Sequence, residues 1–134
     1  MTQNKIVVRY QDGRVVKGYT RDFMPNKEFF HLAPMDAPPD AKPIVISIRE
    51  LKAVFFVKDF TGDRQYQDNK TIDPNKPVIG RKIKVVFKDG EVVVGTTQGY
   101  QPGRPGFFIF SSDPKSNSER CFVISAATTE VSFF

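Results

Sequence analysis

The sequence predicts an all-β protein built from two copies of one five-stranded unit. Its apolar residues include fifteen valines, thirteen phenylalanines and nine isoleucines but only two leucines. β-branched and aromatic side chains favour strands, whereas leucine favours helices. Each half of the chain also contains five short segments of strand character, separated by turn residues. A repeated sequence indicates that the two sets of segments are copies.

The repeat is clearest near the start of each half. Residues 5–25 can be laid over residues 82–102 with ten of 21 positions identical. Towards the end of each half the best match shifts by one position and pairs Ile46-Ser47 with Ile124-Ser125 and Phe55-Phe56 with Phe133-Phe134. Each copy has only about 55 residues, a size at which a lone core is marginal. We therefore expect the copies to pack on each other, to assemble with further chains, or both.

The segments of the first copy can be justified in order. At residues 5–10 apolar and polar side chains alternate, which predicts a strand with one buried face. Asp12-Gly13 then predicts a hairpin turn, because primed turns need a positive φ. The second strand, from about Val15 to Phe23, contains Gly18, which suits a sharp bend. The remaining elements are strands at Phe29–Leu32, Ile44–Ile48 and Ala53–Val57, with a single 3₁₀ turn at 49–52.

The second copy predicts strands at Ile83–Phe87, Val92–Tyr100, Phe107–Phe110, Cys121–Ala126 and Val131–Phe134. Between the copies the chain is polar and contains few apolar residues, which is typical of a linker. The expected organisation is a first unit at 1–60, a linker at 61–80 and a second unit at 81–134.

The composition argues against enzyme chemistry. The chain has one histidine and one cysteine, His31 and Cys121, so it forms neither an internal disulfide nor a His/Cys metal cluster. The carboxylates are scattered on turns, with no pair whose spacing demands general acid/base catalysis, and no glycine-rich phosphate loop is present. We therefore expect no catalysis, no cofactor and no metal. The first residues lack the apolar stretch of a secretion signal, and no apolar run could span a bilayer, so a cytoplasmic protein without membrane contact is expected.

The fold pattern resembles the SH3-like small barrels, and within them the Sm-like domains. The residues that carry this resemblance are Asp12-Gly13-Arg14, Gly18 and Asp22-Phe-Met-Pro-Asn26, with Ile48-Arg49 at a second motif. At that motif Glu50 replaces the usual glycine. The second copy has Gly99 and Gly103 in place of Asp22 and Asn26. The resemblance implies two tandem five-stranded SH3-like (Sm-like) barrels related by internal duplication.

The chain also resembles an uncharacterised bacterial family of tandem-repeat domains. The matching strings cover residues 12–26, 51–60 and 97–108, followed by 112–120. This resemblance implies a bacterial, cytoplasmic protein of regulatory or accessory type and supplies no mechanism.

Protein–protein interaction is the function that we expect first. The corresponding loops, Pro25-Asn-Lys27 and Pro102-Gly-Arg104-Pro105-Gly106, are predicted at the same end of each unit. Proline and glycine hold such loops in one shape, and shaped exposed loops often carry binding surfaces. Tight turns without a partner are an equal alternative for these loops. The candidate partner-binding residues are Lys27, Arg104, Pro105, Phe107 and Arg120.

Nucleic-acid binding is the alternative function. In Sm-like rings a base stacks within the loop that corresponds to residues 22–26, while Asn and Arg bind its edge. A basic stretch, Arg81-Lys82-x-Lys84 with Lys88 shortly after, forms either an anion-binding stripe or a solvated strand face. The net charge of +5 is divided +3 and +2 between the halves rather than concentrated. The candidate residues are Asp22, Met24, Asn26, Arg49, Lys82 and Lys84. The competing interpretation is that Asp22 and Asn26 bind backbone groups of a proline turn.

A cyclic-dinucleotide receptor of the PilZ type is a less favoured third possibility. That family needs an Arg-x-x-x-Arg pair and a later Asp/Asn-x-Ser-x-x-Gly string. The nearest match, Asp113-Pro-Lys-Ser116, has the wrong spacing and lacks the glycine.

Overall fold

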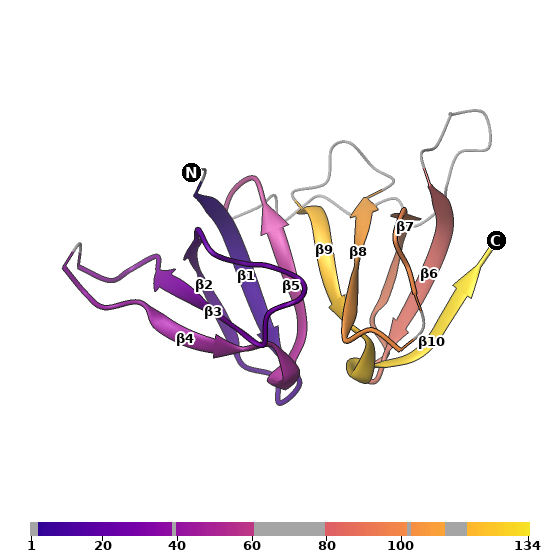
Figure 1. The fold of residues 1–134 in the computed structure, drawn as a ribbon, viewed down its shortest axis with the longest axis horizontal. Coiled ribbons are helices and arrows are strands. Elements are labelled where there is room, and N and C mark those ends of the chain that lie inside the picture. Colours follow the sequence, from indigo (N-terminus) through magenta and orange to yellow (C-terminus); the bar gives the residue numbers. More distant parts are fainter. Residues whose placement is uncertain (1–2, 39, 61–79, 102, 112–117) are drawn as a thin grey trace.

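A computed structural model describes residues 3–38, 40–60, 80–101, 103–111 and 118–134 of the chain (Figure 1). These residues form ten strands and two short 3₁₀ turns. The all-β prediction is thereby confirmed. No helix in this part of the chain has the length and apolarity needed to cross a membrane.

The first half contains five strands and one 3₁₀ turn. They are β1 (Asn4–Tyr10), β2 (Val15–Thr20), β3 (Phe29–Pro34), β4 (Ile44–Ser47), η1 (Ile48–Glu50) and β5 (Leu51–Val57). The 3₁₀ turn begins one residue earlier than expected and ends at Glu50. Leu51 belongs to β5 instead, because it pairs with Tyr10 of β1.

The second half repeats this order of elements. They are β6 (Arg81–Phe87), β7 (Val92–Thr97), β8 (Gly106–Ser111), β9 (Ser118–Ile124), η2 (Ser125–Ala127) and β10 (Thr128–Phe133). The polar composition of residues 125–130 concealed η2 and the start of β10. The expected linker, apart from Gly80, lies outside the described residues.

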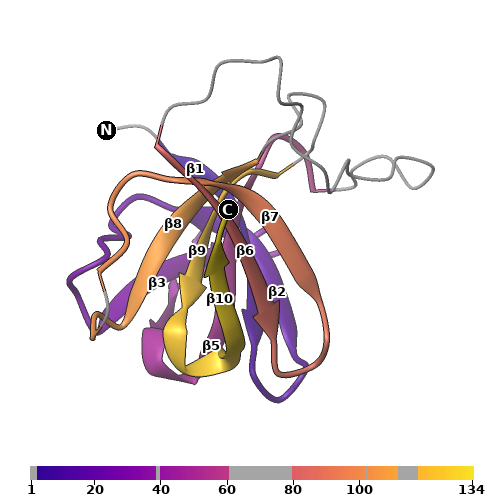
Figure 2. The ribbon, with the colours of Figure 1, turned by 90° about the vertical axis from the view of Figure 1, so that its right-hand side faces the viewer.

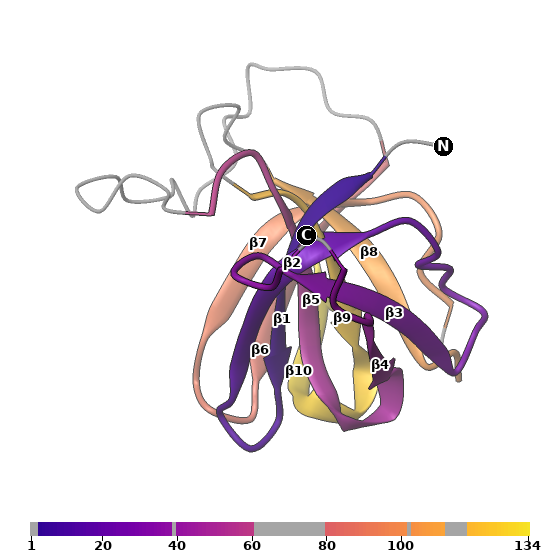
Figure 3. The same cartoon turned by 90° about the vertical axis from the view of Figure 1, so that its left-hand side faces the viewer.

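All ten strands belong to one antiparallel sheet in the order β10-β6-β7-β8-β9-β5-β1-β2-β3-β4. The sheet therefore runs through both halves, which meet where β5 pairs with β9. Its two edge strands, β4 and β10, lie at opposite ends of the molecule (Figure 1). Figure 2 looks onto the β10 end, and Figure 3 looks onto the β4 end.

The strand pairings of the two halves correspond throughout under one alignment, in which residues 5–25 match residues 82–102. Gly18 pairs with Pro34, and Gly95 pairs with Ser111. At the end of each half Ile6 pairs with Phe56, and Ile83 pairs with Phe133. The structural counterpart of Phe133 is therefore Phe56, not Phe55 as the shifted sequence match suggests. The same holds for Ile46, whose counterpart is Val123 and not Ile124, since Phe30 pairs with Ile46 and Phe107 pairs with Val123.

Glycines at hairpins and bends explain why the chain folds locally in this way. Gly13 and Gly90 lie in the two Asp-Gly hairpin turns and have φ angles of 98° and 91°. Residues with a Cβ rarely adopt such positive values. In β2 and β7, a Cβ on Gly18 or Gly95 would collide with the carbonyl oxygen of Ala33 or Phe110. The strands therefore approach each other more closely here than other residues would permit.

The apolar faces of both halves form one core. Phe23, which precedes β3, makes edge-to-face contacts with Phe30 and Phe56 of the first half at centroid distances of 5.1 and 5.5 Å. It also contacts Phe108 and Phe122 of the second half at 6.2 and 5.2 Å. The two halves therefore share an aromatic cluster beside the β5–β9 pair.

Candidate functional site

A groove of about 320 Å³ lies between the two halves. One wall comes from the loop between β2 and β3 together with η1, and the other comes from the start of β8 and the end of β9. We call it the interhalf groove. It is lined by Pro25, Asn26, Lys27, Glu28, Ile48, Arg49, Pro105 and Ile124.

Hydrogen bonds from β2 and β3 fix the first loop. The Asp22 carboxylate accepts hydrogen bonds from the Thr20 hydroxyl at 3.2 Å and the His31 backbone N–H at 3.0 Å. The Nδ1 atom of His31 lies 2.6 Å from the other carboxylate oxygen. Partial burial acts to raise the pKa of Asp22, but the bonds from His31 and Thr20 outweigh it and lower this pKa. Asp22 is thus occupied with holding the loop.

The second loop is tied to η2. The Ser125 N–H donates to the Pro105 carbonyl at 2.9 Å, and the Ser125 hydroxyl donates to the Arg104 carbonyl at 3.2 Å. Gly103 adopts a φ of 89° at the turn of this loop. These bonds hold the backbone that brings Pro105 into the groove wall.

The groove combines an apolar floor with an exposed rim that carries two cations, Lys27 and Arg49, and one carboxylate, Glu28. Ile48 and Ile124 are buried at its base. Lys27 and Arg49 are exposed, and Arg49 Nη2 lies 4.0 Å from Glu28 Oε1. An exposed ion pair at this distance contributes little, so the Arg49 guanidinium stays available to a ligand. The arrangement suits a segment that carries both a carboxylate and an apolar side chain.

The structure separates the five candidate partner-binding residues. Lys27 and Pro105 line the groove, and the exposed Arg104 is adjacent to Pro105. Phe107 is buried, with its ring 4.8 Å from that of Tyr100. Arg120 lies at the other end of β9, where its guanidinium stacks on Phe56 at 4.3 Å and on Phe108 at 5.1 Å.

The candidate nucleic-acid residues are also divided. Asn26 and Arg49 line the groove together, whereas Met24 is exposed on the loop and Asp22 is engaged as described. Lys82 and Lys84 lie on β6, which β7 and β8 separate from β9 in the sheet. Only two of the six residues therefore meet in one site.

Sequence reasoning did not find two features of the region between the halves. Ile48 was noted only as part of the Ile48-Arg49 motif and Ile124 only as a strand residue, and nothing local shows that the two line one groove. The second feature is Lys52 of β5, whose ammonium binds Asp89 at 2.7 Å and also Glu91, and lies 4.8 Å from the Phe87 ring centre. We call this group the Lys52 tether. Its partners lie in the Asp-Gly hairpin of the other half, far away in sequence.

The described residues contain no group of three or more potential metal ligands from His, Cys, Asp and Glu. Cys121 is buried in β9, and burial raises the pKa of its thiol well above the ordinary value. A buried thiol of this kind is a poor nucleophile.

Comparison with known proteins gave one match. A model of a family of unknown function, DUF6982, matches residues 2–134. No curated protein matched the chain, and no solved structure matched it.

Proposed function

The chain belongs to DUF6982, and because that family has no known function we propose one from the interhalf groove. The protein is a non-enzymatic binding module that captures an extended, acidic and partly apolar segment of a partner protein in this groove. It acts by protein–protein interaction as an accessory or regulatory component of a bacterial cytoplasm.

The chemistry of the groove supports this proposal. Lys27 and Arg49 offer two cations on one rim, and an arginine fork is well suited to a carboxylate. Ile48 and Ile124 offer an apolar floor between Pro25 and Pro105. Because hydrogen bonds already hold both loops, a ligand would lose less free energy to ordering them. Juxtaposition of these cations with this floor is the single observation on which the proposal rests.

We further propose that the two halves are duplicated SH3-like, Sm-like units. The shared strand register and the matching Asp-Gly hairpins support this origin. In that case the groove arose between the copies, so a single ancestral unit would have lacked it.

A peptide-binding experiment tests the function. Fluorescence anisotropy would measure the binding of two sets of labelled peptides. In the first set acidic and apolar residues alternate, and in the second set lysine replaces each acidic residue. We expect the acidic set to bind and Arg49→Glu to weaken binding at least about tenfold, since it reverses a charge on the rim. Lys5→Glu, on the exposed face of β1, makes the same change in net charge and is expected to leave binding unchanged. Equal binding of both peptide sets would contradict the proposal.

The second candidate function, binding of RNA or DNA in the manner of Sm-like proteins, is favoured by one observation. Asn26 and Arg49 lie together in the groove, as a base-binding site would need. If this function holds, a labelled uridine-rich oligonucleotide binds in a salt-sensitive way, and Asn26→Ala and Arg49→Ala each weaken it by about 1–3 kcal/mol. Absence of binding at low ionic strength would remove this candidate.

A further inference from the structure

The pairing of β5 with β9 joins the two halves, whose internal strand pairings correspond residue by residue. In this pair Val54 lies opposite Phe122 and Ala53 opposite Val123. The strand from the first half is its last, and the strand from the second half is its fourth. The same two kinds of strand are left at the ends of the sheet: β10 is the last strand of the second half, and β4 is the fourth strand of the first.

We propose that β10 of one chain adds to β4 of a second copy and repeats the β5–β9 junction between molecules. The assembly is head to tail, because the two edges differ and lie at opposite ends of each chain (Figure 1). Such a contact leaves one free edge of each kind and grows into a ring or a filament, depending on the rotation between copies. Transferring the β5–β9 register to the equivalent positions of β10 and β4 places Val131 opposite Val45 and Glu130 opposite Ile46.

Exposure of the β4 side chains supports this pairing. Phe122 and Cys121 are 1% and 3% exposed at the junction within the chain. Their counterparts on the free edge, Val45 and Ile44, are 62% and 38% exposed. Phe134, the residue that follows β10, is 64% exposed. Edge strands in soluble proteins are usually protected from pairing by charge or by covering segments, so the apolar side chains of Val45 and Ile44 exposed along β4 indicate a missing partner.

The aromatic contacts at the junction have counterparts at the free edges. Phe23 corresponds to Tyr100, and Tyr100 repeats two of its contacts, to Phe107 at 4.8 Å and to Phe133 at 5.3 Å. The other two contacts of Phe23, to Phe108 and Phe122, cross the junction. Their counterparts are His31 and Val45. In the proposed assembly, Tyr100 of one copy therefore packs against His31 and Val45 of the next.

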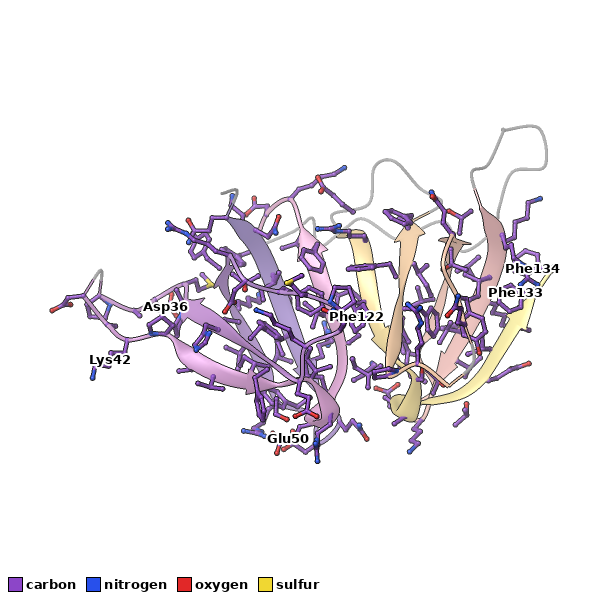
Figure 4. The ribbon with its side chains drawn as sticks, in the orientation of Figure 1. Asp36, Lys42, Glu50, Phe122, Phe133 and Phe134 are labelled. Atoms are coloured by element: carbon purple, nitrogen blue, oxygen red, sulfur yellow. The ribbon has the colours of Figure 1, made fainter. Side chains whose placement is uncertain are left out.

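The outer end of the proposed contact brings together charged groups of both signs. The register places Ala41 opposite Phe134, so the neighbouring Asp40 and the loop that carries Asp36 come close to the end of β10. A hollow of about 500 Å³ lies there, lined by Gly80, Arg81, Lys82, Phe133 and Phe134. Figure 4 labels Asp36 and Lys42 at one end of the molecule and Phe133 and Phe134 at the other. Asp36 and Asp40 of one copy would thus come near Arg81 and Lys82 of the next, although Lys42 lies on the same segment as the two aspartates.

The contact between chains is weaker than the junction it repeats. The counterpart of Lys52 is Thr129, which offers no ammonium to the opposing hairpin. In that hairpin Asp12 already binds Arg14, at 2.8 Å. β4 also has four residues where β9 has seven, so the ladder is shorter. Assembly is therefore expected to be reversible and to depend on protein concentration.

Sedimentation velocity over a range of concentrations tests the proposal with the full chain. We expect the mean mass to rise above the 15.2 kDa of one chain as concentration increases. Val45→Asp blocks the β4 edge and Phe134→Asp blocks the β10 edge, and each variant alone is expected to remain monomeric. A mixture of the two still has one intact edge of each kind and is expected to form a dimer and nothing larger. Val15→Asp, at an exposed apolar position on β2, is the matched control and should assemble like the wild type.

Three outcomes would overturn the proposal: a wild-type mass that stays at one chain at every concentration, assembly that survives both edge variants, or dimers of a single edge variant. The last would show that like edges pair with each other. Should an edge variant fail to fold, as judged by circular dichroism, cysteines provide a second measurement. Mixed Val45→Cys and Val131→Cys chains should form a disulfide-linked dimer on mild oxidation, because the register places these residues opposite each other. Lack of that product, with both variants folded, counts against the register.

Discussion

At the scale of single residues, Lys52 shows how a charge can be kept in a nearly buried position. Its side chain is 10% exposed, whereas those of its partners Asp89 and Glu91 are 56% and 42% exposed. Burial acts to lower the pKa of the ammonium, but the hydrogen bonds to both carboxylates outweigh it and raise this pKa. The bond from Lys52 in turn lowers the pKa of Asp89. Both shifts favour the charged forms, so at neutral pH the ion pair between Lys52 and Asp89 links the two halves.

We predict that Lys52→Met lowers the free energy of unfolding by about 2 kcal/mol, because hydrogen bonds to charged groups are lost. The pH dependence has two limits. The lysine contribution is present below the ordinary lysine pKa and is lost as pH rises through the raised value. The Asp89 contribution is present above the ordinary aspartate pKa, about 4, and is lost as pH falls through the lowered value. Urea unfolding between pH 3 and pH 11 measures both limits.

Lys5→Met is the control for this measurement, since Lys5 is an exposed lysine of β1. It is expected to change the unfolding free energy by less than about 0.5 kcal/mol. An equal effect of both substitutions would show that the Lys52 tether has no special role.

At the scale of single elements, sequence patterns predicted the strands and hairpins that depend on residues close together in the chain. Alternating side chains located most of the strands, and each Asp-Gly pair located a hairpin. The 3₁₀ turn η2 and the start of β10 were not found, because Ser125-Ala126-Ala127 and Thr128 lack the apolar alternation on which strand prediction rests. Their positions follow instead from the pairing of β10 with β6.

The bend of β7 gives a prediction about close approach. Gly95→Ala places a Cβ against the Phe110 carbonyl oxygen and the Ile109 side chain, so the strands must separate. We expect a loss of about 1–3 kcal/mol in unfolding free energy, as for overpacked cores. Gly99→Ala is the matched control, because no atom lies within 4 Å of a Cβ there. Chemical denaturation compares the two, and equal stabilities would show that β7 and β8 can separate without cost.

The end of β10 gives a prediction about two adjacent phenylalanines. Phe133 packs against Tyr100 and carries the Arg81 guanidinium 3.8 Å above its ring. Phe134 is largely exposed and is held by one backbone bond to Lys82, at 3.3 Å. We expect Phe133→Ala to destabilise the protein by about 2 kcal/mol, from the apolar burial that is lost. Phe134→Ala should leave the melting temperature of the monomer unchanged, and the reverse order would mean that the strand register at β10 is shifted by one residue.

At the scale of the whole molecule, the sequence revealed the repeat but not how its copies meet. Pairing of β5 with β9 joins residues that lie far apart in the chain, and no local pattern shows which of several similar strands will pair. The candidate site could not be predicted from the sequence for the same reason. Lys27, Asn26, Arg49 and Pro105 were all singled out for their residue types, yet their meeting in one groove with Ile48 and Ile124 depends on that junction.

The junction also predicts that the two halves unfold together. Phe23 packs against aromatic rings of both halves, and β5 and β9 share a ladder of hydrogen bonds. Hydrogen exchange of the β1 and β6 amides should therefore give the same opening free energy, because neither strand can open without breaking the shared cluster. Phe23→Ala should lower both values by a similar amount, about 2 kcal/mol, as apolar contact is lost on each side. If exchange accelerates in β1 alone, the halves are independent units, and the aromatic cluster is a contact between folded domains rather than part of one cooperative core.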